Sequence, residues 1–319
     1  MAFAGATKNY AAAYQTNDTR IAFALEDQYG IIPTGAYQMA RFTGESFRQQ
    51  FQRNRPEEID DIPEAAQAVT TQVSVSGSLS GALSWGTYDD LLAAVMGGDW
   101  ADDGLTNGRL VKCWTIIERL GDSWIIRNGG FIRQAQLNFS QGGFAQVSFD
   151  MAFKGEKRQG ASPASSLIAA PTGDVINTVK GFGGLTIGGV APEGCVRSFQ
   201  LSLQRNGADT DYGMGHADAC GIRPGELLAT GSLEIFFRNY ELYDRFVDGQ
   251  QGAITATVRD GLNQGYDLTF LNASLQNPQI NAGGKNQSVI ARFDLEGNPQ
   301  PGGGTFSIRR FKPETPPKA

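Results

Sequence analysis

The chain has 319 residues, of which 40% are hydrophobic, enough for one large core or two ordinary ones. Its charged fraction of 19% and its 41 glycines favour short strands and turns over a helical bundle. The formal net charge of -6 argues against a protein that grips nucleic acid through its phosphates, although a surface past which DNA slides remains compatible with it.

The cysteines and the N-terminal residues are typical of a cytoplasmic protein. The chain has an odd number of cysteines, Cys113, Cys195 and Cys220, and they lack CxxC spacing. We therefore expect free thiols rather than disulfides or a zinc site. The N-terminal residues lack the basic segment and apolar run of a signal peptide, and no run of about 18 apolar residues occurs. We therefore expect neither a signal peptide nor a membrane span.

The first strong pattern along the chain is a strand followed by a helix. From Val73 to Trp85, Val and Leu alternate with serines, which predicts a strand with one apolar face and one face of hydroxyl groups. Apolar residues at helical spacing follow, with Thr87 as the expected N-cap and Gly97 as the stop. Next, residues 131–140 and 145–153 alternate around a Gln-Gly-Gly turn, which predicts an antiparallel hairpin.

The strand and helix recur in the second half of the chain. Residues 227–238 alternate, and a second short apolar stripe follows, with Asn239 as the expected cap and Gly249 as the stop. Ser-Gly-Ser-Leu at 76–79 matches Thr-Gly-Ser-Leu at 230–233. Two further matches support an internal duplication: Ser46-Phe47 with Ser198-Phe199, and residues 146–155 with 288–297.

The predicted fold is mainly β, with two tandem β-sandwich or barrel-forming units that each carry one short flanking α-helix. We place the first unit, with an N-terminal arm, at residues 1–158, and the second, with a C-terminal arm, at 177–319. The Ala/Ser/Pro-rich residues 159–176 between them lack periodicity and are interpreted as a linker. We expect the C-terminal arm to hold at most one short strand and to dock on a neighbouring subunit.

Candidate catalytic residues are scarce. The single histidine, His216, could hold a metal with Asp218 and Cys220, but a flexible loop is the preferred interpretation because the corresponding loop at 55–63 has neither His nor Cys. Without a second histidine or a nucleophile motif, acyl transfer is also disfavoured.

Two further patterns have non-catalytic interpretations. The acids Glu57, Glu58, Asp60 and Asp61 resemble the carboxylate pair of a glycosidase, yet four acids in five residues are more typical of a solvated loop. The glycine clusters at 181–189 lack the spacing of phosphate-binding loops. We therefore predict no enzyme, and no catalytic, cofactor-binding or metal-binding residues.

Several segments together resemble a tail tube protein of long, non-contractile-tailed bacteriophages. They are Leu25-Glu26-x-x-Tyr29-Gly30-x-x-Pro33, residues 42–46 (Phe-Thr-Gly-Glu-Ser), residues 55–59 (Arg-Pro-Glu-Glu-Ile) and the strand and helix of residues 77–100. The resemblance covers almost the whole chain. It implies a structural virion protein without cofactors, whose copies form stacked rings and a tube through which DNA passes without specific binding. It also implies tape measure, tail terminator and distal tail proteins as partners, and assembly in the host cytoplasm.

Two questions remain open in the sequence. Rings of single-unit relatives are sixfold, so two fused units favour a homotrimer with pseudo-sixfold symmetry; the alternative is a homohexamer with one unit outside the tube as decoration. A carbohydrate- or host-binding β-sandwich module of a virion is the second interpretation. It rests on Trp85, Trp100, Trp114 and Trp124, which also suit core packing.

Overall fold

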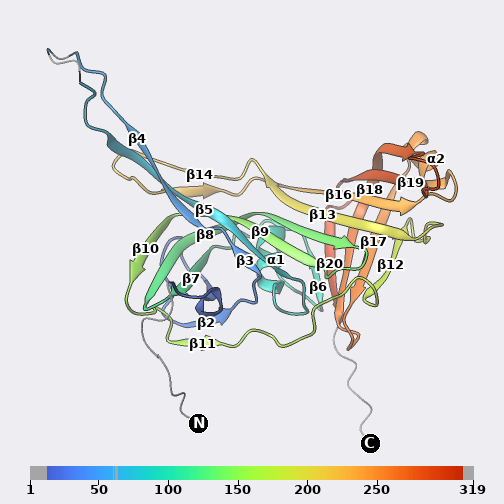
Figure 1. Cartoon of the computed structure of the whole chain (residues 1–319), viewed down its shortest axis with the longest axis horizontal. Coiled ribbons are helices and arrows are strands. Elements are labelled where there is room, and N and C mark those ends of the chain that lie inside the picture. Colours follow the sequence, from blue (N-terminus) through green and yellow to red (C-terminus); the bar gives the residue numbers. More distant parts are fainter. Residues whose placement is uncertain (1–12, 60, 62–63, 312–319) are drawn as a thin grey trace, which may run out of the picture.

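The computed structural model describes residues 13–59, 61 and 64–311, and these form an extended protein built around a large β-sheet (Figure 1). Strands account for 53% of the chain and helices for 6%, which confirms the predicted mainly β class. Up to residue 168 the elements are η1 (Thr16–Asp18), β1 (Arg20–Leu25), β2 (Ala36–Met39), β3 (Gly44–Glu45), β4 (Arg48–Asn54), β5 (Val69–Ala82), α1 (Asp89–Met96), β6 (Gly104–Thr106), β7 (Trp114–Leu120), β8 (Ser123–Ser140), β9 (Gln146–Phe153), β10 (Gly155–Gln159) and β11 (Ser166–Ile168). The later elements are β12 (Phe182–Ile187), β13 (Val196–Asn206), β14 (Asp209–Asp211), β15 (Gly221–Arg223), β16 (Glu226–Phe236), α2 (Glu241–Val247), β17 (Gln251–Arg259), β18 (Gly265–Asn281), β19 (Ile290–Gly297) and β20 (Phe306–Phe311).

A continuous antiparallel layer runs through both halves of the chain. Its strand order is β4-β5-β9-β8 in the first half and β13-β16-β19-β18 in the second. The two halves join where β13 pairs with β8, from Ser198 opposite Ser140 to Gln204 opposite Gln134. We call these eight strands the shared layer.

The long strands β8 and β18 leave the shared layer at one end. The first part of β8 pairs with β7 and β10, and this part continues through β1 and β2 to β11 in a second layer below the shared one (Figure 1). Glycines occur where β8 changes layer: Gly129 has φ 63°, and a Cβ on Gly130 would lie 2.6 Å from the Trp114 carbonyl oxygen. The corresponding part of β18 pairs with β17 and β20.

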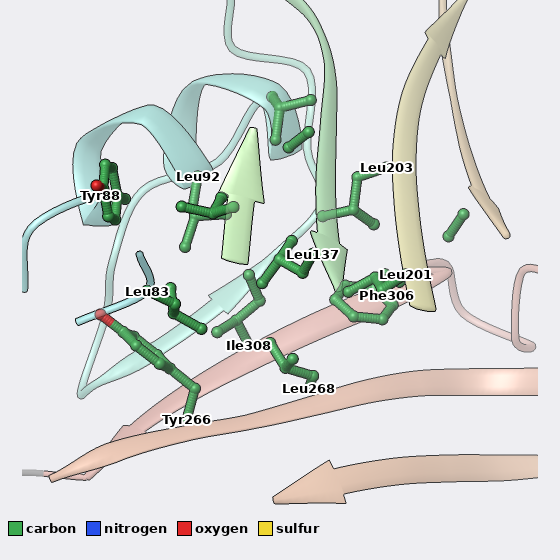
Figure 2. Close-up of a cluster of buried hydrophobic side chains, with 14 of the residues drawn as sticks. Leu83, Tyr88, Leu92, Leu137, Leu201, Leu203, Tyr266, Leu268, Phe306 and Ile308 are labelled. Atoms are coloured by element: carbon green, nitrogen blue, oxygen red, sulfur yellow. The ribbon is translucent and has the colours of Figure 1, made fainter. Parts of the chain in front are cut away.

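One hydrophobic core joins the two halves. Its members come from α1, from the strands of both halves and from the C-terminal strand β20. Figure 2 shows Leu83, Tyr88 and Leu137 of the first half beside Leu201, Leu203, Tyr266, Leu268 and Phe306 of the second. Because buried apolar area is the main stabilising term, the halves stabilise each other.

A buried polar network connects the same elements. Asp89, at the start of α1, accepts a hydrogen bond of 2.6 Å from the Tyr266 hydroxyl of β18 and one of 2.8 Å from Arg310 of β20. Arg310 also pairs with Asp103 at 3.2 Å, and Tyr266 accepts a hydrogen bond from the Gly86 amide. An acid in the first turn of a helix is stabilised by the helix dipole, and this one has its charge compensated although it is buried.

The predicted strands and helices are confirmed, with changes at their ends. β5, the β8–β9 hairpin and β16 lie where alternation predicts them, and α1 ends at Gly97 in the left-handed conformation. α2 begins after Tyr240, and the side-chain oxygen of the predicted cap Asn239 accepts a hydrogen bond of 3.2 Å from the Glu241 amide at its start. The prediction of Thr87 as the cap of α1 was wrong, because α1 begins after Tyr88. The Thr87 hydroxyl instead hydrogen-bonds Ser84 at 2.7 Å.

Two segments can be compared with the predicted linker and C-terminal arm. The predicted linker contains β11, which pairs in parallel with β2, and its end is held by hydrogen bonds between Ile176 and the first half. Within the described residues the C-terminal arm holds one strand, β20, which pairs with β6 and β18 of its own chain, and docking of the arm on a neighbouring subunit stays a prediction. Residues 312–319 of that arm lie outside the described residues.

The strand register also shifts the predicted repeat. Both arrays have the same strand order, which is compatible with a duplication and leaves it a prediction. With Leu79 and Leu233 matched, their partners are Glu45 and Phe199, so Phe47 does not correspond to Phe199. Leu79 also pairs with Phe149, and Leu233 with Phe293, which makes these two phenylalanines equivalent. The sequence match of residues 146–155 with 288–297 differs from this equivalence by two positions.

We expect Asp89→Ala to lower the free energy of unfolding by about 3 kcal/mol, because it leaves Tyr266 and Arg310 buried or half-buried without their acceptor. Asp99→Ala removes an exposed carboxylate that pairs with Lys112 and should cost at most about 1 kcal/mol. Urea unfolding followed by far-UV circular dichroism measures both. Equal effects would mean that the network contributes nothing beyond a surface ion pair.

Stability should fall in alkaline solution. Burial raises the pKa of Tyr37 and of Tyr88 to about 12, and burial together with Asp89 raises the pKa of Tyr266 well above its ordinary value. These hydroxyls keep their protons in the folded state while unfolded tyrosines lose theirs, so the stabilisation is complete below pH about 10 and is lost as the pH rises towards about 12. Urea unfolding at several pH values tests this. Tyr88→Phe should make the decline shallower, and an unchanged slope would contradict the assignment.

Candidate functional site

One face of the shared layer is polar from β4 to β18. Residues directly opposite each other on neighbouring strands lie on the same face, and the register places small or amide side chains together in row after row. Along one row, Ser80, Ser148, Gln136, Ser202 and Thr230 follow each other from β5 to β16. The polar face comprises Arg48, Ser76, Ser78, Ser80, Gln134, Gln136, Asn138, Gln146, Ser148, Asp150, Ser198, Gln200, Ser202, Gln204, Thr230, Ser232, Glu234, Gln276, Gln279, Asn281, Arg292, Asp294 and Glu296.

The opposite face of the same strands is apolar. Leu79, Leu137, Leu201 and Leu233 alternate with the polar residues and are fully buried in the core. The serine-faced strands predicted from the sequence, β5 and β16, therefore turn their hydroxyl groups away from the core. A shallow hollow crosses the polar face where the two halves join, lined by Gln136, Asn138, Gln200, Leu201, Ser202, Thr230, Gly231, Ser232 and Arg292.

Charges on the polar face are few and nearly balanced. Its carboxylates are Asp150, Glu234, Asp294 and Glu296, and its guanidinium groups are Arg48 and Arg292, with Arg133 at the β8 bulge beside them. Arg133 pairs with Asp150 at 2.9 Å, and Arg292 lies 3.9 Å from Glu234. Such a surface lacks the dense positive charge that binds nucleic acid phosphates.

The shared layer has an unpaired edge at each end. β4 pairs with β5 on one side only, and the edge of Leu275–Asn281 that faces away from β19 has no strand beside it among the described residues. Ser46 donates its amide to Ser78 of β5, so the Phe47 amide points to the open side, where it donates to Glu45 of its own chain at 2.7 Å. Open edges are the usual place where a second chain adds strands.

The two helices differ in what covers them. α1 is buried along seven of its eight residues and contacts both β8 and β13. Arg205 of β13 donates a hydrogen bond of 2.7 Å to the Val95 carbonyl near the end of α1, and its burial lowers the pKa of the guanidinium. In α2 only Leu242 is buried, and Tyr243 and Val247 are 38% and 62% exposed.

The residues considered for chemistry are not assembled into a site. His216 and Cys220 are exposed, and no cluster of three or more metal-ligating side chains occurs within the described residues. Glu57 and Glu58 are exposed on a loop, Asp60 lies outside the described residues, and Asp61 follows it. No described helix is long and apolar enough to cross a membrane.

Trp114 is buried, and the other three tryptophans are partly buried against the cores. Trp85, Trp100 and Trp114 belong to or pack against the main core, and Trp124 packs against the smaller core of Ala22, Tyr37 and Ile126. Their rings are thus committed to packing.

A buried carboxylate that the sequence did not single out for chemistry proves structural. Glu26 accepts hydrogen bonds of 2.6–2.7 Å from Thr115, Gly30 and Gly129. Burial, with a further contribution from Glu26, raises the pKa of the nearby Cys113 thiol to about 11, so this thiol is protonated and unreactive at neutral pH.

A polar sheet face and open strand edges are features of proteins that assemble with other chains. Comparison with known families decides which kind of protein this is: the phage tail tube protein family matches residues 16–297. The chain belongs to that family. No curated protein matches the chain. The match spans both halves of the shared layer, and the family is a structural one whose members are components of a virion tail.

Proposed function

We propose that copies of this chain assemble into rings that stack into the tail tube, with the polar face of the shared layer turned to the lumen through which DNA passes. The observation that carries the proposal is the continuity of that face across all eight strands. Closing such a layer on itself would remove both open edges, as in any barrel. The uncharged hydroxyl and amide groups would let DNA move without phosphate binding.

Three chains per ring are favoured over six. Both halves contribute four strands to one continuous layer, and α1 packs beneath the junction between them. A decoration unit outside the tube would need no strand pairing with the other unit. Three chains would therefore supply six similar wall segments with pseudo-sixfold symmetry, and we propose tandem units at residues 1–158 and 177–319 joined by 159–176.

The remaining partners follow from the place of a tube in a tail. A tape measure protein would occupy the lumen before ejection, and terminator and distal tail proteins would bind the two ends. Assembly would take place in the host cytoplasm. A sugar-binding module finds less support, because the four tryptophans that suggested it are packed against the cores.

Negative-stain electron microscopy of purified protein tests assembly directly. We expect rings at low protein concentration and stacked tubes at high concentration. Mass photometry should give the rings a mass of three chains. A protein that stays monomeric under all salt and concentration conditions, with tape measure protein present or absent, would contradict the tube proposal.

Charge placed on the polar face should create DNA binding. Gln136→Arg and Ser232→Arg add guanidinium groups beside the hollow, so assembled tubes of the double variant should retain DNA at low salt and release it as salt rises. Leu262→Arg, on an exposed turn away from the face, is the matched control and should bind no more than the unaltered protein. Equal DNA binding by control and variant would argue against a lumen on this face.

A further inference from the structure

The junction between the two halves shows what an open edge of this protein pairs with. In the first half, β8 has four strand partners: β9 and β10 follow each other along one edge, and β7 and β13 follow each other along the other. In the second half, β18 has only three: β19 and β20 share one edge, and β17 lies on the other up to Ser274. Among the described residues, no strand occupies the place that corresponds to β13.

The missing strand at the other end of the layer is complementary. β13 lies between β16 and β8. β4 occupies the corresponding place in the first half, but among the described residues it lies beside β5 alone. At one end of the shared layer, β18 thus lacks a strand like β13, which β4 of another copy could supply. At the other end, β4 lacks a strand like β8, which β18 of another copy could supply. We propose that residues Ser46–Arg48 of one copy pair antiparallel with residues Gln279–Asn281 of a second copy, in the register of the β8–β13 junction.

The register follows from a repeated tripeptide. Gln136-Leu137-Asn138 pairs with β9 such that Leu137 faces the residue two positions before Phe149. Gln279-Ile280-Asn281 pairs with β19 such that Ile280 faces the residue two positions before Phe293. Phe149 lies opposite Leu79, and Phe293 lies opposite Leu233. These leucines end the two matched Ser/Thr-Gly-Ser-Leu segments, so the two tripeptides are equivalent.

The same procedure aligns β4 with β13. Arg48 lies opposite Ser76 and Ser202 opposite Thr230, which makes Arg48 and Ser202 equivalent. Within the chain, Ser202 lies opposite Gln136 and Gln200 opposite Asn138. Between copies, this places Arg48 opposite Gln279 and Ser46 opposite Asn281, both on the polar face.

The uncovered helix is an independent observation. α1 is covered by β13, where Arg205 reaches its last turn, but α2 has no such cover. The residue of β4 that corresponds to Arg205 is Phe51, which shares the apolar face with Val73 and is 55% exposed. A second copy docked as proposed brings Phe51 over the exposed Tyr243 and Val247 side of α2.

The contact is head to tail, so repeated addition gives a ring when it closes. Natural edges are often protected against indiscriminate pairing. Here Pro278 sits in a bulge of β18, between the pairs made by Gln276 and Gln279, and Glu45 caps the Phe47 amide. Both features restrict pairing to a short segment and favour one register.

Disulfide trapping tests the pairing and its register, which rest on the proposed ring. Ser46 directs its amide towards β5, so pairs at Ser46 and Arg48 are of the non-hydrogen-bonded kind, whose close Cβ atoms suit a disulfide. In a Cys195→Ser, Cys220→Ser background, Ser46→Cys/Asn281→Cys and Arg48→Cys/Gln279→Cys should give covalent multimers on a non-reducing gel. Under the trimer proposal the ladder ends at three chains.

Two control pairs accompany the test. Asn138→Cys/Gln200→Cys reproduces the same geometry inside one chain and should form a disulfide without increasing the mass. Ser46→Cys/Gln276→Cys combines the same edge residue with a partner outside the proposed register and should form no multimer. Rings or tubes in the microscope without cross-links above this mismatched control would overturn the proposed pairing and leave the tube function standing. Cross-linked multimers that never form rings or tubes would support the pairing and contradict the tube function.

Phe51→Glu tests the cover of α2. The side chain is largely exposed in the single chain, so circular dichroism and the thermal midpoint should stay unchanged, while the protein concentration needed for ring formation should rise more than about tenfold. Leu262→Glu, a change of equal chemistry at an exposed turn, should leave it unchanged. Equal ring formation by both variants would remove α2 from the proposed contact.

Discussion

The main-chain pairing of β13 with β8 is the interaction on which the architecture depends. It joins two four-stranded arrays into one layer, and it places Leu201 and Leu203 over α1 and the core of the first half. Without it, α1 would expose its apolar residues, and the network around Asp89 would lose the elements that bring Tyr266 and Arg310 to it. The two halves are therefore one cooperative structure, although their strand order repeats.

The alternation of side chains along the strands couples the core to the polar face. A strand has period two, so every leucine that enters the core directs its neighbours to the opposite face. Selection for a stable core and selection for a smooth polar face thus act on adjacent residues of the same strands. A shift of one residue in any pairing would expose leucines and bury glutamines, which gives the register of the shared layer strong specification.

The sequence allowed the strands and helices to be predicted, because these depend on local periodicity. The family was predicted from a resemblance, which rests on the order and spacing of several short segments. Ser74 to Ser80, alternating with Val and Leu, predicted both β5 and its polar face. The junction was beyond reach, since nothing in residues 131–140 says which distant strand lies on their second edge. The cap at Thr87 failed for a related reason: its hydroxyl has a closer partner in Ser84, a contact that propensity does not contain. The side chain of Asn239, in contrast, accepts a hydrogen bond from Glu241 at the start of α2. The repeat predicted from the sequence is displaced by two residues from the one that the strand register gives. A shift by two residues keeps every side chain on its correct face, so the alternation pattern does not reveal it.

The difference between the two helices has a physical reason in the two kinds of junction. The junction inside the chain forms as the protein folds, at the high effective concentration of linked segments, so its helix can be covered at once and completely. A junction between chains forms only on assembly, and until then its apolar surface must remain soluble. The exposed side chains of Tyr243 and Val247 on α2, one Phe on β4, and edges protected by Glu45 and Pro278 suit that requirement. In the proposed trimer, the fused chain would halve the number of contacts that must form between molecules, and it would keep those that remain weak enough to wait for assembly.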